Sequence, residues 1–191
     1  DYSEPVTQTS MRVSGALWAL DSALAYRRHY PSVNWNRSYS LYWELMRGWF
    51  EENAPAGWLN RRQEAATLLQ REAELQEVVQ LVGPDALQDG ERLILEVSRL
   101  IREVFLQQNA FSDNDAYSSL EKSFGILDTI LSFYAECQKV LQREIPLNTI
   151  LALPLREQIA RLHEEPNEGF LATKDALIER AKTTLAELEL E

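Results

Sequence analysis

Residues 58–108 read WLNRRQEAATLLQREAELQEVVQLVGPDALQDGERLILEVSRLIREVFLQQ, and this stretch decides the fold. Apolar residues recur at helical spacing in both halves, which predicts one helix over 58–82 and another over 91–108. Gly83-Pro84 between them is a helix stop, so the two helices are expected to fold back as an αα-hairpin. The apolar positions are Leu68, Leu75, Val79 and Val82, then Leu93, Val97, Leu100 and Val104, with Ile94, Ile101 and Phe105 beside the second stripe.

Polar side chains rich in Glu, Gln and Arg occupy the rest of the first helix. Glu72 and Glu74 are two of these side chains, and Glu51 and Glu52 form a similar acidic pair earlier in the chain. Acidic pairs of this kind are typical of a solvated helix face. We therefore assign Glu72 and Glu74 to the solvated surface, with no acid–base role.

Helical patterns continue on both sides of the hairpin, separated by Gly, Pro, Ser and Asp breaks. Residues 109–117 have the composition of a loop, and Ser118 or Ser119 is the expected N-cap of the helix that follows. The remaining predicted helices are 41–52, a long helix from the Ser cap to about 142, a short piece between Pro146 and Pro154, one from Pro154 or Leu155 to His163, and a last one from about 170 to Leu190.

The first forty residues differ from the rest in their high aromatic content and their mixture of β-branched residues with Ser and Thr. Residues 6–13 are expected to be extended, and residues 22–29 to form a short helix stopped by Pro31. The predicted fold class is mainly α: a helical bundle with a long αα-hairpin and an irregular or extended N-terminal lead-in. We divide the chain into a lead-in over 1–40 and a helical domain over 41–191.

The composition narrows the classes of function. A formal net charge of −11 argues against a nucleic-acid partner, because neutralising phosphates needs clustered Lys and Arg. Charged residues interrupt every apolar stretch well before the roughly 20 residues of a membrane-spanning helix, so no membrane insertion is expected. The N-terminus has neither the basic nor the apolar region of a signal peptide, and no initiator Met. We expect a piece of a cytoplasmic protein.

No self-contained catalytic equipment is visible. The chain has only 7 Gly and no Gly-rich phosphate-binding motif. His29 and His163 lack neighbouring Cys or His at metal-ligand spacing, so no metal site is predicted. The single cysteine, Cys137, lies in an apolar helical pattern and is expected to be a buried, inert thiol in a reducing compartment.

Four segments carry a specific resemblance. They are DYSEPVT at 1–7, LAYRRHYPSVNW at 24–35, LVGPDALQDGERL at 81–93 and FLQQNAF at 105–111. In this order and spacing they resemble the C-terminal region of the catalytic A (alpha) subunits of V-type and A-type rotary ATPases. The likeness covers essentially the whole chain and is thin after Glu165. It implies that residues 1–40 are a lead-in from the nucleotide-binding domain.

In the family and the related F-type beta subunit, aromatic residues from outside the phosphate-binding domain grip the adenine ring of ATP. The resemblance gives this role to Tyr30 and Phe111, and less closely to Tyr117. It also implies that Gln108 and Asn109 offer hydrogen bonds near the base edge. Aromatic faces stacked on a purine supply the dispersion and area burial such a pocket needs. Core packing is the alternative for each aromatic alone, although Phe111 stands in a polar loop where a large apolar side chain needs a reason.

The resemblance also implies a rotor contact. The turn after residue 83 corresponds to the acidic rotor-facing loop of F-type beta subunits, here with fewer acidic residues. The contact is therefore expected to depend on shape more than on charge, and the alternative is an ordinary helix–helix connection. The residues concerned are Pro84, Asp85, Ala86, Leu87, Gln88 and Asp89.

The family role implied for the whole protein is coupling of ATP hydrolysis or synthesis to proton or sodium transport. Its substrates would be ATP and ADP with Mg²⁺, whose ligands lie outside this chain, so the chain alone is expected to be inactive. Its partners would be B subunits in an alternating A3B3 ring and a central-stalk rotor subunit, peripheral to the membrane. The competing interpretation is a free-standing helical protein-interaction module without a nucleotide role. That module would bury Tyr30 and Phe111 in one core.

Overall fold

The protein is described by a computed structural model in which residues 3–188 are placed. The predicted fold class is confirmed, because helices make up most of the chain and the one sheet among the described residues has two short strands. In chain order the elements are α1 Pro5–Val13, β1 Ala16–Leu17, α2 Ser22–Tyr26, β2 Tyr39–Ser40, α3 Trp43–Asn53, α4 Trp58–Val82, the 3-10 turn η1 Pro84–Ala86, α5 Asp89–Leu100, the π-helical η2 Ile101–Leu106, α6 Leu120–Leu141, α7 Leu147–Leu151, α8 Leu155–Ala160, the 3-10 turn η3 Leu162–Glu164 and α9 Phe170–Ala186.

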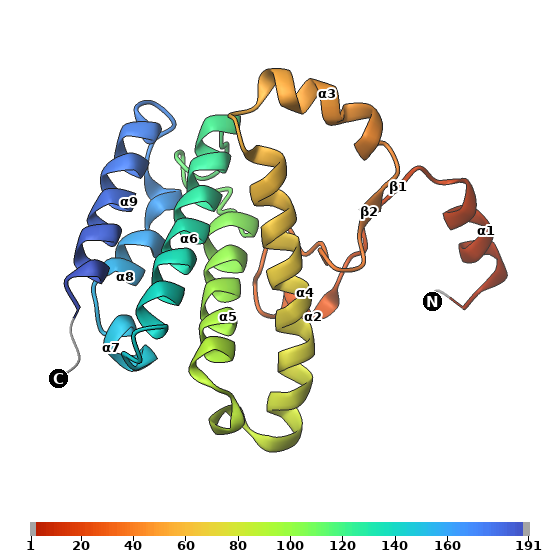
Figure 1. Cartoon of the computed structure of the whole chain (residues 1–191). Coiled ribbons are helices and arrows are strands. Elements are labelled where there is room, and N and C mark those ends of the chain that lie inside the picture. The colour runs from red at the N-terminus through yellow and green to blue at the C-terminus, as the bar shows by residue number, and fades with distance from the viewer. Residues whose placement is uncertain (1–2, 189–191) are drawn as a thin grey trace.

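The predicted αα-hairpin is confirmed, with α4 and α5 lying side by side (Figure 1). α4 has the predicted bounds because a glycine with positive φ stands at each end: Gly57 at 93° and Gly83 at 87°. Glycine adopts such a conformation at little cost, and Pro84 then prevents the helix from continuing.

α6 is the central helix of the bundle. It packs against α4 and α5 on one side and against α9 and α8 on the other (Figure 1). Ser119, one of the two predicted caps, begins it by accepting a hydrogen bond from the Lys122 backbone N–H at 3.1 Å. Cys137 is fully buried in this helix, and burial raises the pKa of its thiol to about 12, which confirms the predicted inert cysteine.

The structure of the lead-in corrects two predictions. Residues 6–13 were expected to be extended, but they lie in the helix α1. Pro5 occupies the first turn, where its fixed φ favours a helix, and the hydroxyls of Thr9 and Ser10 bond back to carbonyls four residues earlier. The predicted helix over 22–29 is also shorter, since α2 ends at Tyr26 and Arg28 takes a positive φ of 59°.

The hairpin corrects two more predictions about which side chains face solvent. Glu72 was assigned to the solvated surface, but it is buried and forms an ion pair with Arg102 of η2. The packing of α5 and η2 onto α4 brings that guanidinium to it. Val82 was placed on the buried stripe, yet it is exposed, because α4 at the tip extends beyond the helices that cover its middle (Figure 1).

Two predicted helices end differently in the structure. The helix expected over 91–108 is α-helical only to Leu100 and continues as the π-helix η2 to Leu106. The last helix was expected to reach Leu190, but α9 ends at Ala186, and residues 189–191 lie outside the described part of the chain. Across residues 3–188, no helix combines the length and apolar character needed to cross a membrane.

Candidate functional site

The three aromatic residues singled out from the sequence are on the surface. Phe111 is 100% exposed, Tyr117 72% and Tyr30 54%. The interaction-module alternative requires Tyr30 and Phe111 to share a buried core, and that prediction is wrong. Large aromatic rings exposed to this degree contribute little to the free energy of folding, so core packing does not explain them.

A backbone hydrogen bond brings the lead-in to the loop that follows η2. The Gln108 N–H donates to the Tyr30 carbonyl at 2.8 Å. Beside Tyr30, His29 is buried with its ring centroid 5.7 Å from that of Trp35, and burial lowers the pKa of its imidazole. The segment carrying Tyr30 is thus held next to the start of the loop that carries Phe111.

The loop over 107–119, which carries Phe111, is ordered by its own side chains. The Asn109 N–H donates to the buried Asp115 carboxylate at 2.6 Å. The Asn109 amide oxygen accepts from the Phe111 N–H at 3.0 Å. The backbone N–H of Gln108 and the amide oxygen of Asn109, two of the groups expected near a base edge, are therefore already used within the loop and its support.

The π-helix η2 leads directly into this loop. Its final wide turn is closed by a hydrogen bond from the Gln107 N–H to the Arg102 carbonyl at 2.9 Å. Arg102 also forms the buried ion pair with Glu72 of α4, so side chain and backbone of one residue connect the hairpin to the loop. π-helical segments are rare and often occur at functional sites.

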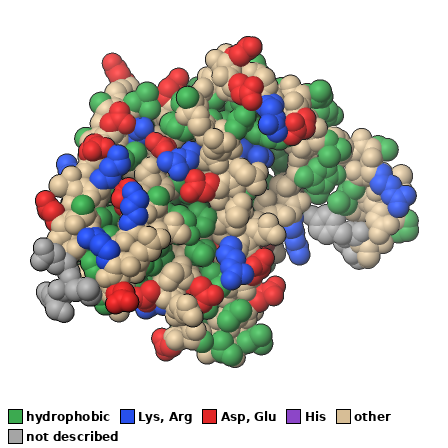
Figure 2. All heavy atoms as spheres, viewed as in Figure 1, with side chains coloured by type: hydrophobic (Ala, Val, Ile, Leu, Met, Phe, Trp, Pro, Cys, Tyr) green, Lys and Arg blue, Asp and Glu red, His purple; other side chains and the backbone are tan. Residues whose placement is uncertain are grey.

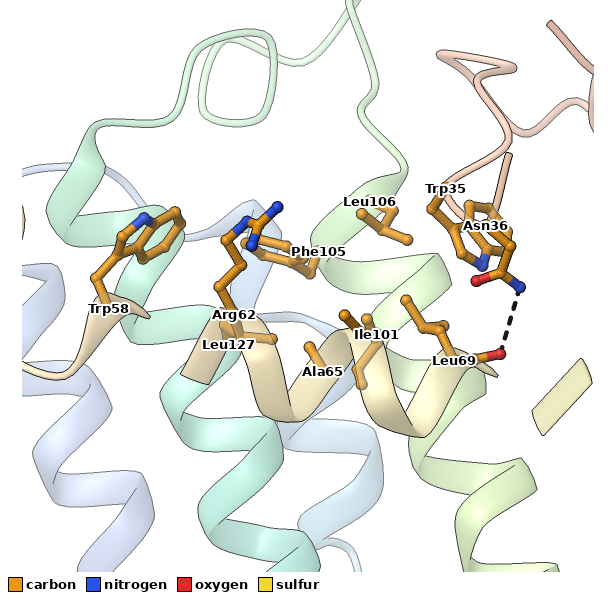
Figure 3. A pocket seen from close by; sticks show the side chains of 11 residues that line it. Trp35, Asn36, Trp58, Arg62, Ala65, Leu69, Ile101, Phe105, Leu106 and Leu127 are labelled. Atoms are coloured by element: carbon orange, nitrogen blue, oxygen red, sulfur yellow. Dashed lines mark hydrogen bonds between the residues drawn. The ribbon is translucent and has the colours of Figure 1, made fainter. Parts of the chain in front are cut away.

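An apolar pocket of about 280 Å³ lies between the lead-in and the bundle (Figure 3). Trp35 closes one end, and Phe105 and Leu106 of η2 line its side (Figure 3). Asn36 lies beside Trp35 at this end of the pocket and donates to the Leu69 carbonyl at 3.5 Å, so polar as well as apolar contacts dock the lead-in on α4 (Figure 3).

Arg62 is the one charged residue among those that line the pocket. Its guanidinium carbon lies 3.9 Å from the ring centroid of Trp43, and burial lowers the pKa of the guanidinium. At the start of α4, Trp58 makes ring contacts with Phe50 of α3 and Phe124 of α6. These contacts anchor α3 to the bundle through aromatic side chains.

The hairpin tip presents a small apolar surface. Val78, Leu81 and Val82 are exposed there. Figure 2 shows hydrophobic side chains at the lower end of the molecule, where Figure 1 places the tip of the α4–α5 hairpin. Among the predicted rotor-contact residues, Leu87 is buried and Asp89 is engaged within the fold, where its carboxylate accepts from the Leu147 N–H at 2.8 Å. The surface of the tip that a partner can reach is therefore formed by η1, Gln88 and the end of α4.

The sequence interpretation missed three buried charged side chains: those of Glu72, of Lys122 and, in the loop over 107–119, of Asp115. Glu72 follows Leu68 by four positions and precedes Leu75 by three, so the helical period itself places it on the buried face. Lys122 is fully buried at the start of α6, where it precedes the buried Ile126 by four positions, so the same period places it on the buried face. Among residues 3–188, no group of three or more His, Cys, Asp or Glu side chains is arranged to hold a metal ion.

Comparison with known proteins gives consistent matches. The family model "C-terminal domain of V and A type ATP synthase" matches residues 47–151. An A subunit of the A-type ATP synthase of Methanospirillum hungatei is 51% identical over 165 residues, which are 86% of this chain and 28% of that protein. The A subunit of the A-type ATP synthase of Methanopyrus kandleri is 51% identical over 168 residues (88% and 28%). The V-type ATP synthase alpha chain of Clostridium perfringens is 49% identical over 179 residues (94% and 30%). The chain thus spans less than a third of the length of these curated relatives.

Proposed function

Because the chain belongs to the family of C-terminal domains of V- and A-type ATP synthases, we propose that it forms the adenine side of an ATP site. The observation that carries this proposal is the complete exposure of Phe111 on an internally braced loop. A ring held away from the core on an ordered loop can stack on a purine without a large ordering cost on binding.

Tyr30 is the second wall of the proposed site. Its backbone is bonded to Gln108, so nucleotide contacts made by the lead-in and by the Phe111 loop would be mechanically connected. Tyr117, at the far end of the same loop, is the third exposed ring. The side-chain amides of Gln108 and Asn109 stand at the near end, where amide donors and acceptors suit the edge of a base.

The phosphates and Mg²⁺ of ATP or ADP are assigned to another part of the full-length protein. In this division, residues 1–40 are the lead-in that joins the nucleotide-binding domain, and residues 41–191 are the C-terminal helical domain. The whole protein would hydrolyse or synthesise ATP and couple it to proton or sodium transport. This chain alone would bind the base weakly and turn over no ATP.

The hairpin is proposed to contact the rotor. Its exposed tip combines η1 Pro84–Ala86 with the apolar end of α4, which suits a contact based on shape. In an alternating A3B3 ring, B subunits would flank the chain and a central-stalk rotor subunit would pass the tips. The assembly would place the chain on the cytoplasmic side, peripheral to the membrane.

The test is Phe111→Ala in the full-length protein. ATP affinity should fall by about 1–3 kcal/mol, the range for loss of a ring stacked on a base. Phe111→Tyr should be nearly neutral because the ring face is kept. Turnover at saturating ATP should fall less than affinity, because phosphate positioning is unchanged. Isothermal titration and steady-state kinetics measure the two quantities.

Tyr26→Ala is the matched control, since Tyr26 is an exposed aromatic of the lead-in with no proposed nucleotide contact. It should leave ATP affinity unchanged. An unchanged affinity in Phe111→Ala, or an equal loss in both variants, would refute the adenine assignment.

A further inference from the structure

Lys122 is among the largest fully buried side chains of residues 3–188, with 0% of its surface exposed. Its ammonium donates to three backbone carbonyls, those of Asn114, of His163 at 2.8 Å and of Glu165 at 2.6 Å. An ammonium has three donors, so its hydrogen-bonding capacity is fully used. A long charged side chain is seldom buried unless it is paired, so its place here requires a specific reason.

The three carbonyls belong to two segments that are distant in sequence. Asn114 lies in the loop that carries Phe111, whereas His163 and Glu165 lie in and after η3. Lys122 thus fastens the loop to the segment between α8 and α9. It acts from α6, the central helix of the bundle.

Side chains reinforce the same connection. The Asn114 amide donates to the Glu164 carbonyl at 2.9 Å. Asn167 accepts from the Ser119 N–H at 2.8 Å and donates to the Tyr117 carbonyl at 3.0 Å. Both ends of the later half of the loop are therefore tied to the segment around residues 163–167.

Charge inside the loop complements the buried ammonium. Burial lowers the pKa of Lys122, and the nearby carboxylates of Asp115 and Glu165 act in the opposite direction. Asp115 is itself buried and accepts the Asn109 N–H, two residues before Phe111. A chain of contacts therefore runs from Lys122 through the body of the loop to the residue that holds the Phe111 backbone.

We propose that Lys122 is a positioning residue for the nucleotide base: its ammonium holds the Phe111 loop in the conformation that exposes the Phe111 ring. This inference rests on the proposed adenine site. Without Lys122, the carbonyls of Asn114, His163 and Glu165 would lose their donor and the loop would lose its attachment to η3. The Phe111 ring would then become ordered only when ATP binds. This ordering cost weakens the binding of ATP but leaves the contacts with its phosphates unchanged.

The experiment replaces Lys122 by Met in the full-length protein, which keeps the length of the side chain and removes its donors. Affinity for ATP should fall about five- to tenfold, less than the largest loss expected for the ring itself. Affinity for inorganic triphosphate, which has no base, should stay within about twofold because the phosphate contacts are untouched. An equal loss for both ligands, or no loss for ATP, would overturn the proposal.

Lys174→Met is the matched control. Lys174 is also a largely buried lysine of the bundle, but its ammonium pairs with Asp128 and Asp175 rather than with the loop. It should leave both affinities within about twofold of wild type. If it weakens ATP binding as much as Lys122→Met does, the effect is a general loss of stability and the positioning role is wrong.

A double variant separates this inference from the proposed function. If Lys122 acts through Phe111, adding Lys122→Met to Phe111→Ala should cost less than about twofold in further ATP affinity. An additive loss would refute action through the ring. If Phe111→Ala alone leaves ATP affinity unchanged, the proposed adenine site is refuted. If Phe111→Ala weakens ATP binding while Lys122→Met does not, only the positioning role of Lys122 is refuted.

Should Lys122→Met fail to fold, Asn114→Ala provides the second test. It removes one exposed tie between the loop and Glu164 and leaves the buried ammonium in place. It should give the same selective loss for ATP over triphosphate, about two- to threefold, since a single neutral hydrogen bond is removed. Equal affinities for ATP in this variant and wild type would contradict the proposal.

Discussion

Two regions of this protein, a bundle and a rim, differ in how far their apolar side chains are exposed to solvent. The bundle comprises α4 to α9, and the rim comprises α1, α3 and the Phe111 loop. In the bundle, Leu93 and Ile130 are completely buried, whereas in the rim Leu45 is 81% and Phe111 100% exposed. The structure describes every residue of α1 and α3, and none of their side chains is buried. Apart from the hairpin tip, the bundle thus buries most of its large apolar side chains, while the rim presents apolar surface suited to contacts with other surfaces.

α3 shows how the two regions meet. Its Phe50 lies almost parallel to Trp58 of α4, with ring centroids 6.4 Å apart, so one face of the helix is attached to the bundle. Its other face carries Leu45 and Trp49, which stay exposed. A helix with one anchored and one bare apolar face adds little to the core. Its sequence is therefore better explained by contacts than by stability.

The largest effect on stability that tests this comparison is expected when a buried aromatic ring is removed. Phe133→Ala should lower the free energy of unfolding by about 3–5 kcal/mol, because loss of the buried ring leaves a cavity beside α6. Leu45→Ala, the same kind of truncation on α3, should change it by less than about 0.5 kcal/mol. Urea unfolding followed by circular dichroism measures both. Comparable losses in the two variants would mean that α3 belongs to the core.

A smaller effect is expected for the buried ion pair. Glu72→Ala leaves the Arg102 guanidinium without its partner and should cost about 2–3 kcal/mol, below the usual range because 22% of that arginine side chain meets solvent. Glu74→Ala, two positions away and paired with Arg71 on the surface, should cost less than about 1 kcal/mol. The same unfolding experiment compares them. Equal costs would show that the Glu72 pair is solvated in solution.

The smallest effect on stability is expected at the hairpin tip. Leu81→Ser with Val82→Ser should change the free energy of unfolding by less than about 0.5 kcal/mol, because both side chains are exposed. In the assembled complex the same pair should lower the coupling of ATP turnover to rotation while ATP affinity is kept. Single-molecule rotation and nucleotide titration measure these quantities. A parallel fall in affinity would contradict the rotor assignment.

The sequence was most informative where local chemistry sets the structure. Both bounds of α4 were predicted because Gly57, Gly83 and Pro84 mark them within the chain itself. The extended segment predicted over residues 6–13 was wrong because β-branched residues suggested a strand, while Pro5 in the first turn favours the helix α1. The candidate aromatics came from a family resemblance, and their exposure could not be derived from the sequence.

The sequence by itself determined the helical class, the hairpin, a serine cap at Ser118 or Ser119 and the buried cysteine, because periodicity, capping residues, glycine and proline act through neighbouring residues. Only the tertiary structure decided that Glu72 is paired with Arg102, that Gln108 is bonded to Tyr30, and that Lys122 supports the Phe111 loop. Each of these contacts joins segments that pack together only in the folded chain. Their formation depends on how whole helices pack, and packing sums many weak apolar contacts that no local pattern encodes.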